Sequence, residues 1–212
     1  TLPYRLPDYR VIQPEHYLPA FEDAFAQHRR QIEAITSVTA APTFENTMVP
    51  LERSGELLHD VASAFYTVSS ADATEEIQGI EETLAPLMAA HTDAVQLDAA
   101  LYRRITSLHD ELDDLDLAPE DRYLVERHYR EMTQAGAGLD ATQKARLSEI
   151  NGRLSTLTTT FEKNLLNDTN DLAVVFDDVA DLDGLTEGEI SAAARAAADR
   201  GIQNAWLVSL TL

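Results

Sequence analysis

Histidine is the residue of this chain best suited to metal binding or proton transfer, because imidazole binds metals and titrates near neutral pH. The chain has six histidines and no cysteine. No two histidines are four residues apart, so there is no His-Glu-x-x-His helix, the motif in which two histidines on one face hold zinc. His28, His91 and His128 fall on the apolar faces of three different predicted helices. They could converge as metal ligands, but hydrogen-bonded core histidines are commoner, and we favour that alternative.

Two acidic stretches also have spacings that occur in metal sites. Residues 56–59 have the Glu-x-x-His spacing of di-iron helical bundles, but the sequence holds no second copy, which such a site requires. Residues 177–184 resemble a calcium-binding loop. If Gly184 takes the sixth loop position, Val179 and Ile190 occupy positions that require oxygen ligands. We therefore interpret residues 56–59 as an exposed helix face and residues 177–184 as an acidic turn.

Motifs for phosphate binding or nucleophilic catalysis do not occur in the sequence. It contains no Gly-x-Gly-x-x-Gly, no phosphate-binding loop and no Gly-x-Ser-x-Gly elbow. We assign no catalytic, cofactor-binding or metal-binding residue within residues 1–212.

The chain is strongly acidic, with 16 Lys and Arg against 37 Asp and Glu and a formal net charge of −21. Such a surface repels nucleic-acid phosphates and anionic lipids, so we expect neither as a partner. Hydrophobic residues make up 44% of the chain, enough for a folded core. The sequence contains no run of eighteen apolar residues that could span a bilayer. The chain begins without a secretory signal, and we expect a cytoplasmic protein.

Apolar residues recur at spacings of three and four, which predicts amphipathic helices. Six such helices are predicted, at residues 14–35, 47–70, 74–95, 98–115, 119–135 and 140–165. The second helix begins at Thr47 with Pro50 in its first turn, or at Thr43 with a kink at Pro50. The sixth helix carries a continuous apolar seam, namely Leu147, Ile150, Leu154, Leu157, Phe161 and Leu165.

The pattern changes after residue 170. Residues 171–177 and 205–212 have the branched, apolar composition of strands, and residues 186–200 between them predict a helix. The predicted fold is mainly α, an antiparallel helical array or bundle with a small C-terminal strand–helix–strand unit. We predict an N-terminal helical domain at residues 1–170, with residues 171–212 leading into a further domain. Because the chain lacks an initiator Met and ends on an apolar strand, we expect a fragment of a longer protein.

Several short sequence motifs, which occur in a particular order along the chain, resemble those of a known family. They include Thr43-Phe44-Glu45-Asn46-Thr47, Leu51-Glu52-x-Ser54-Gly55-Glu56-Leu57-Leu58, Phe161-x-x-Asn164-Leu165-Leu166 and Ala205-Trp206-Leu207. Together they resemble the N-terminal region of the thimet-oligopeptidase-like zinc metallopeptidases, and within that family the bacterial peptidyl-dipeptidase branch. Each motif alone is weak evidence for the family. Together, in this order and at these spacings, the motifs are specific, and they extend over nearly the whole chain.

The resemblance implies that this chain is a wall of the deep channel in such a peptidase. The zinc would be held by a His-Glu-x-x-His helix in the missing catalytic half, which would pack against this domain. The parent enzyme would hydrolyse short peptides, releasing dipeptides from their carboxyl termini, and the fragment alone would be inactive. Two alternatives stay open: an oligo-endopeptidase of the same family, and a non-catalytic helical module that binds a partner helix.

Overall fold

The computed structural model describes residues 6–209, except for the side chain of Asn170. The chain divides into two compact units, Thr1–Thr159 and Thr160–Leu212. The division falls within a single long helix. The domain boundary that we predicted at residue 170 stays a prediction.

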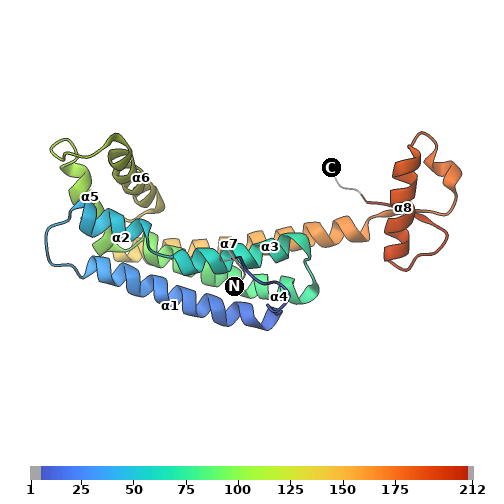
Figure 1. Cartoon of the computed structure of the whole chain (residues 1–212), viewed down its shortest axis with the longest axis horizontal. Coiled ribbons are helices and arrows are strands. Elements are labelled where there is room, and N and C mark those ends of the chain that lie inside the picture. The colour runs from blue at the N-terminus through green and yellow to red at the C-terminus, as the bar shows by residue number, and fades with distance from the viewer. Residues whose placement is uncertain (1–5, 210–212) are drawn as a thin grey trace. The chain divides into compact units, whose positions relative to one another are not determined.

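The first unit is helical, as predicted (Figure 1). Its elements are a short 3₁₀ turn at Pro14–His16 followed by α1 (Tyr17–Thr36), a π-helical turn at Phe44–Met48 followed by α2 (Val49–Glu52), α3 (Glu56–Ala71), α4 (Glu75–Gln96), α5 (Ala99–Asp110), α6 (Pro119–Ala135) and the first part of α7 (Ala141–Asp171). Among the described residues, no helix is both long and apolar enough to cross a membrane.

Local signals set most of the helix starts. Thr74 accepts a hydrogen bond from the Ile77 amide at the start of α4, and Asp98 accepts two from the first turn of α5. Pro119 takes the first position of α6, where its missing N–H costs nothing. Asp140 caps α7 by accepting a hydrogen bond from the Gln143 amide at 2.9 Å. These starts agree with the sequence prediction to within about two residues, the usual uncertainty of a helix end.

Of the two starts predicted for the second helix, the structure has the one at Thr43, and a helix that runs without interruption to residue 70 is wrong. The helical segment begins after Thr43, whose hydroxyl accepts from the Asn46 amide, and α2 ends at Glu52. A break follows, in which Gly55 adopts φ = 75°, a left-handed conformation that glycine reaches without strain. Both segments contact α1, and the apolar spacing continues across the break, so periodicity alone does not reveal it.

Helix α1 contributes to two apolar clusters in the first unit. Its N-terminal half supplies Phe21 and Phe25 to an aromatic cluster with Phe65 of α3 and Leu84 of α4. Its C-terminal half supplies buried residues to the second cluster, which comprises Ile32, Ile35, Met48, Leu101, Ile105, Leu108, Leu112, Val125, Met132 and Ala137. Helix α1 therefore connects the α3–α4 pair to the α5–α6 pair.

The second unit contains the predicted strand–helix–strand. Strands β1 (Val174–Phe176) and β2 (Trp206–Val208) pair antiparallel, with Val174 opposite Val208 and Phe176 opposite Trp206. Between them lie a 3₁₀ turn at Val179–Leu182 and α8 (Glu187–Asp199), which packs on β2. The last three residues of the predicted second strand, 210–212, lie outside the described part of the chain.

Candidate functional site

Two of the three histidines that could have converged on a metal meet in the core of the first unit. The Nδ1 atom of His28 lies 2.9 Å from Nε2 of His91, and Nε2 of His28 lies 3.2 Å from the Ser54 hydroxyl. That hydroxyl donates its proton to the Leu51 carbonyl at 2.6 Å, so it must accept from His28. The proton of neutral His28 is therefore on Nε2, and His91 donates from its own Nε2 to Nδ1 of His28. The chain of hydrogen bonds joins α4, α1 and the turn after α2.

The environment of the pair keeps both rings neutral. Burial, together with the nearby His28 and Arg29, lowers the pKa of His91 to about 4. Burial also lowers the pKa of His28. The ring of Phe25 stacks on His91 with centroids 4.7 Å apart. Nδ1 of His91 has no hydrogen-bond partner within residues 6–209, so a second proton on this ring would find no acceptor there.

His128 takes a different partner. Its Nε2 lies 2.6 Å from the Glu52 carboxylate. His28, Glu52, Ser54 and His128 line one cavity of about 310 Å³. Within the described residues, no three His, Asp or Glu side chains are grouped so that they could hold a metal ion. His28 and His91 are hydrogen-bonded to each other in the core, which is the arrangement that we favoured from the sequence.

The other sequence candidates have structural roles or none. His16 accepts a hydrogen bond from the Gln13 amide before α1, His59 is exposed, and His109 stacks on Tyr129. The acidic stretch 177–184 forms a turn, as predicted, in which Asp178 accepts from the Ala180 amide.

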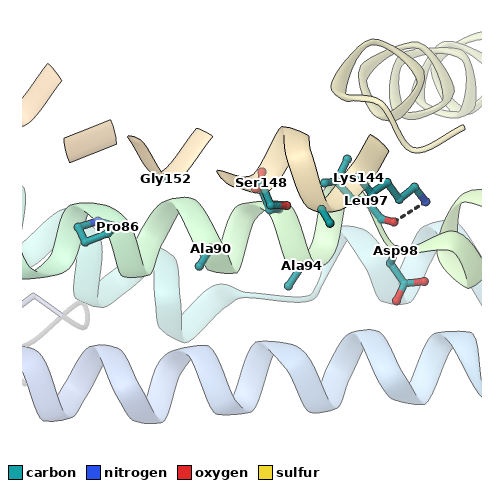
Figure 2. A pocket seen from close by; sticks show the side chains of 10 residues that line it. Pro86, Ala90, Ala94, Leu97, Asp98, Lys144, Ser148 and Gly152 are labelled. Atoms are coloured by element: carbon teal, nitrogen blue, oxygen red, sulfur yellow. Dashed lines mark hydrogen bonds between the residues drawn. The ribbon is translucent and has the colours of Figure 1, made fainter. Parts of the chain in front are cut away.

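The α4–α7 groove is a second hollow, within the first unit (Figure 2). It has a volume of about 390 Å³ and is lined by Pro86, Ala90, Asp93, Ala94, Leu97, Asp98, Lys144, Ala145, Ser148 and Gly152. Figure 2 shows Ser148 and Gly152 on α7, which runs alongside the part of α4 that carries Pro86, Ala90 and Ala94. Two polar contacts join the helices: Asn151 donates to Oδ1 of Asp93 at 2.8 Å, and Lys144 donates to the Leu97 carbonyl at 2.9 Å.

Two buried polar side chains in this unit were not predicted from the sequence. Arg104 is 7% exposed and donates to the carbonyls of Val38 and Ala40 and to the side chains of Asn46 and Thr47. Asp93 is 9% exposed, and no residue that the structure describes is hydrogen-bonded to its second oxygen, Oδ2. Both residues lie among apolar residues on amphipathic helices, and this position was the only indication in the sequence that they are buried.

The apolar seam of α7 is exposed rather than buried. In the first unit Ile150, Leu154 and Leu157 are 46%, 59% and 48% exposed. On the part of α7 in the second unit, Phe161 and Leu165 are 66% and 57% exposed. Single exposed apolar residues are ordinary, but a periodic row of five on one helix is typical of a contact surface.

No family model matches the chain, but its sequence is similar to several known proteins. It is 36% identical to a dipeptidyl carboxypeptidase of Escherichia coli, over 99% of this chain and 31% of that protein. It is 35% identical to the dipeptidyl carboxypeptidase of Salmonella typhimurium and 28% identical to oligopeptidase A of the same organism, with the same coverage. The chain thus spans about a third of the length of these relatives. Over nearly its whole length, the chain is a homologue of the dipeptidyl carboxypeptidases and oligopeptidases A.

Proposed function

We propose that this chain is the helical channel wall of a longer zinc peptidase that degrades short peptides. The observation that carries the proposal is its 36% identity to a dipeptidyl carboxypeptidase over 99% of the chain, which corresponds to 31% of that relative. In this proposal the wall limits access to short, unfolded peptides and positions them, and it contributes no catalytic group.

The exposed seam of α7 supports the proposal that a further part of the polypeptide packs against this chain. Leu154 and Leu157 lie at helical spacing with about half of each side chain exposed. Burial of apolar surface lowers the free energy by about 25 cal/mol for each Å² removed from water. The proposal assigns this seam to the contact with the catalytic part of the same polypeptide.

The zinc of the proposed enzyme belongs to that other part. The described residues do not offer a set of three suitable side chains, and the histidine pair uses its facing nitrogens in hydrogen bonds to each other. When bound, zinc would polarise the scissile carbonyl and activate water. No step of that chemistry is assigned to a residue of this chain.

Release of dipeptides from the carboxyl end is the preferred activity, because identity to the dipeptidyl carboxypeptidase is 36%, against 28% for the oligopeptidase A of Salmonella typhimurium. Internal cleavage, as an oligopeptidase, is the nearer alternative. We propose a cytoplasmic location for the parent enzyme.

A non-catalytic module that binds a partner helix is the second candidate. The observation that favours it is again the α7 seam, since an amphipathic helix could pack against Leu154 and Leu157. The two proposals differ in what covers the seam: the rest of the same polypeptide or a separate protein.

A paired assay distinguishes them. The natural polypeptide that carries this sequence and the isolated residues 1–212 are purified and tested for bound zinc and for release of dipeptides from an N-terminally blocked peptide. Zinc, with activity that a chelator abolishes, is expected in the natural polypeptide only. A natural polypeptide without zinc or peptidase activity contradicts the channel-wall proposal and favours the helix-binding module. Products cut from the middle of the peptide instead favour the oligopeptidase.

A further inference from the structure

A further hollow of the first unit, the α1–α2 groove, lies between the C-terminal end of α1 and the segment that begins with the π-helical turn. Its volume of about 530 Å³ is within the range of small-molecule sites. Its lining residues are Gln31, Ala34, Ile35, Val38, Glu45, Asn46, Val49, Pro50 and Arg53. Four of them are polar, and the others form an apolar floor.

The wall that the π-helical turn contributes is held from behind by a buried side chain. Turns of this kind are rare and are frequent at functional sites. Arg104 donates to the side chains of Asn46 and Thr47 and to the Val38 carbonyl, so it ties the turn to the end of α1. Oδ1 of Asn46 also accepts from the Thr43 amide, and its nitrogen donates to the Ala41 carbonyl. The wall is therefore built before any ligand arrives, which lowers the entropic cost of binding.

Two side chains of opposite charge line this groove, and both are exposed. No described residue is ion-paired or hydrogen-bonded to the side chain of Glu45 or Arg53. Arg53 follows Glu45 by eight residues, which is about 12 Å at the rise of an α-helix. Val49 and Pro50 lie between them in the sequence and belong to the apolar floor. The groove thus carries an acceptor and a donor that are separated by an apolar stretch.

The remaining polar side chain, Gln31, adds a donor near Arg53. Its Oε1 accepts from the amide of Gly55, two residues after Arg53, at 2.9 Å. This bond leaves the Nε2 group of Gln31 as a donor, and no described residue accepts from it. A guanidinium and an amide N–H together suit a carboxylate, whereas Glu45 suits an ammonium group. The groove is complementary to a zwitterion.

The separation of the two charges sets the length of this zwitterion. Three residues of extended chain span about 10 Å, close to the spacing of Glu45 and Arg53 along their segment. A single amino acid is too short to reach both charges.

We propose that the α1–α2 groove binds an extended peptide of about three residues with free termini. Its ammonium group lies at Glu45, its carboxylate lies at Arg53 and Gln31, and its middle lies on the apolar floor. The choice of a peptide among zwitterions of this length rests on the proposed function, whereas the binding of such a zwitterion does not.

The test uses the natural polypeptide that carries this sequence and 8-aminooctanoate as the probe, with binding followed by calorimetry and by ligand-observed saturation-transfer NMR. The probe has as many bonds between its nitrogen and its carboxyl carbon as a tripeptide has, and no peptide bond to cut. 4-Aminobutyrate carries the same charges on a shorter chain. 8-Aminooctanoate should bind saturably and at least about tenfold more tightly than 4-aminobutyrate, a difference of about 1.4 kcal/mol. Equal affinity, or no saturable binding, overturns the proposal.

1,8-Diaminooctane separates the groove from general attraction to an acidic surface. A chain with a net charge of −21 attracts this dication more strongly than a zwitterion wherever binding is non-specific. In the groove the second ammonium group would meet Arg53, so 8-aminooctanoate should bind more tightly than the diamine. Tighter binding of the diamine contradicts the proposed site.

Single substitutions locate the binding. Glu45→Gln and Arg53→Gln each remove one charge from the groove, and Ala34→Leu fills the groove without changing either charge. Each should weaken the binding of 8-aminooctanoate at least about threefold. Arg30→Gln and Glu33→Gln are the matched controls and should bind as the wild type does, because both residues are exposed on α1 and neither lines the groove. A probe bound elsewhere on the polypeptide would bind all five variants equally, and that result overturns the proposal.

Trialanine tests the assignment to a peptide. Measured with a chelator present, so that the proposed zinc enzyme does not consume it, trialanine should bind about as tightly as 8-aminooctanoate. N-acetylation removes the ammonium group, and Arg53→Gln removes the partner of the carboxylate, so each should weaken trialanine binding at least about threefold. Binding of 8-aminooctanoate without binding of trialanine overturns the assignment to a peptide.

The groove and the proposed function can fail separately. A natural polypeptide that binds 8-aminooctanoate in the groove but has neither zinc nor peptidase activity contradicts the channel-wall proposal and leaves the zwitterion site in place. A zinc peptidase whose binding of the probe is unchanged by Glu45→Gln and Arg53→Gln contradicts the groove alone.

Discussion

At the residue scale, the most informative group is the hydrogen-bonded pair of His28 and His91. The two neutral imidazoles are hydrogen-bonded to each other, and through Ser54 they connect three helical segments. Each ring is held in one tautomer because every hydrogen bond of the series has a fixed direction. Protonation of either ring must break one of those bonds or leave an N–H without an acceptor.

The pair predicts a loss of stability in mild acid. The pKa of His91 is about 4 in the folded protein against an ordinary value of 6.5. Between these pH values the unfolded chain binds a proton that the folded chain does not. The stabilisation is therefore complete above about pH 6.5 and is lost as the pH falls toward 4. It amounts to about 1.4 kcal/mol for each unit by which the pKa of His91 differs between the folded and unfolded states.

Denaturant unfolding between pH 7 and pH 4.5 measures this effect. His91→Phe removes the titrating group, and its free energy of unfolding should depend less on pH over this range than that of the wild type. Exposed His59→Gln is the control and should keep the wild-type dependence. Equal pH dependence in wild type and His91→Phe would contradict the assignment.

Arg104 gives a second prediction at this scale. Its guanidinium donates to four neutral groups, among them the carbonyl of Val38 at 2.9 Å and the side chain of Asn46 at 2.6 Å. Lysine cannot reproduce the fork geometry, so Arg104→Lys should lower the free energy of unfolding by about 2 kcal/mol. Exposed Arg103→Lys is the matched control, with an expected change of less than about 0.5 kcal/mol. Urea denaturation of the two variants checks both values.

At the element scale, the break between α2 and α3 positions the histidine pair. Gly55 has φ = 75°, and a methyl group on it would lie 3.1 Å from the ring of His28. Ser54, the hydrogen-bond partner of His28, is in the same turn. The break thus brings a hydroxyl to the imidazole where a continuous helix would not.

Two glycine-to-alanine changes should have opposite effects. Gly55→Ala introduces left-handed strain and crowds His28, so it should destabilise the protein by at least about 1 kcal/mol. Gly152→Ala, within α7 and with no neighbouring atom within 4 Å, should stabilise it by about 0.5–1 kcal/mol. Thermal unfolding of both variants gives the comparison. A stabilising Gly55→Ala would show that the turn is not strained by a side chain.

The elements that local chemistry defines could be predicted, and those that depend on distant contacts could not. Thr74, Asp98 and Pro119 mark helix starts through their own side chains and near neighbours. By contrast, His28 and His91 are 63 residues apart, and Asp93 and Asn151 are 58 apart. Their pairing depends on helix packing, which periodicity does not determine. Periodicity also identified the α7 seam without showing that its residues from Ile150 onward are exposed.

At the scale of the whole molecule, the α7 seam is the feature that points beyond the chain. It is as regular as the buried faces of α1 and α5, yet Leu154 is 59% exposed. A row of this kind is a liability in a protein that never covers it, because it promotes association. We propose that the rest of a longer polypeptide covers it; the match to the dipeptidyl carboxypeptidase of Escherichia coli covers 31% of that relative.

A charge on the seam should therefore matter only in the proposed longer protein. Leu154→Glu should change the stability of isolated residues 1–212 by less than about 0.5 kcal/mol, as for other exposed sites. In the natural polypeptide the same change should lower the melting temperature by several degrees and reduce peptide hydrolysis. Tyr123→Glu, at a position 58% exposed on α6, is the control and should have little effect in either form. Equal small effects of Leu154→Glu in both would argue against a covered seam.

The pairing of β1 with β2 has a consequence for how this region can vary. Val174 lies opposite Val208, so the chain leaves the strand–helix–strand unit beside the point where it came in, about 5 Å away. The path of the polypeptide on either side does not depend on how much chain lies between these two residues. The segment between the two paired strands is therefore a structural insertion whose two ends lie close together. Helix α8 and its turns could be lengthened, shortened or exchanged between homologues while the flanking backbone keeps its course.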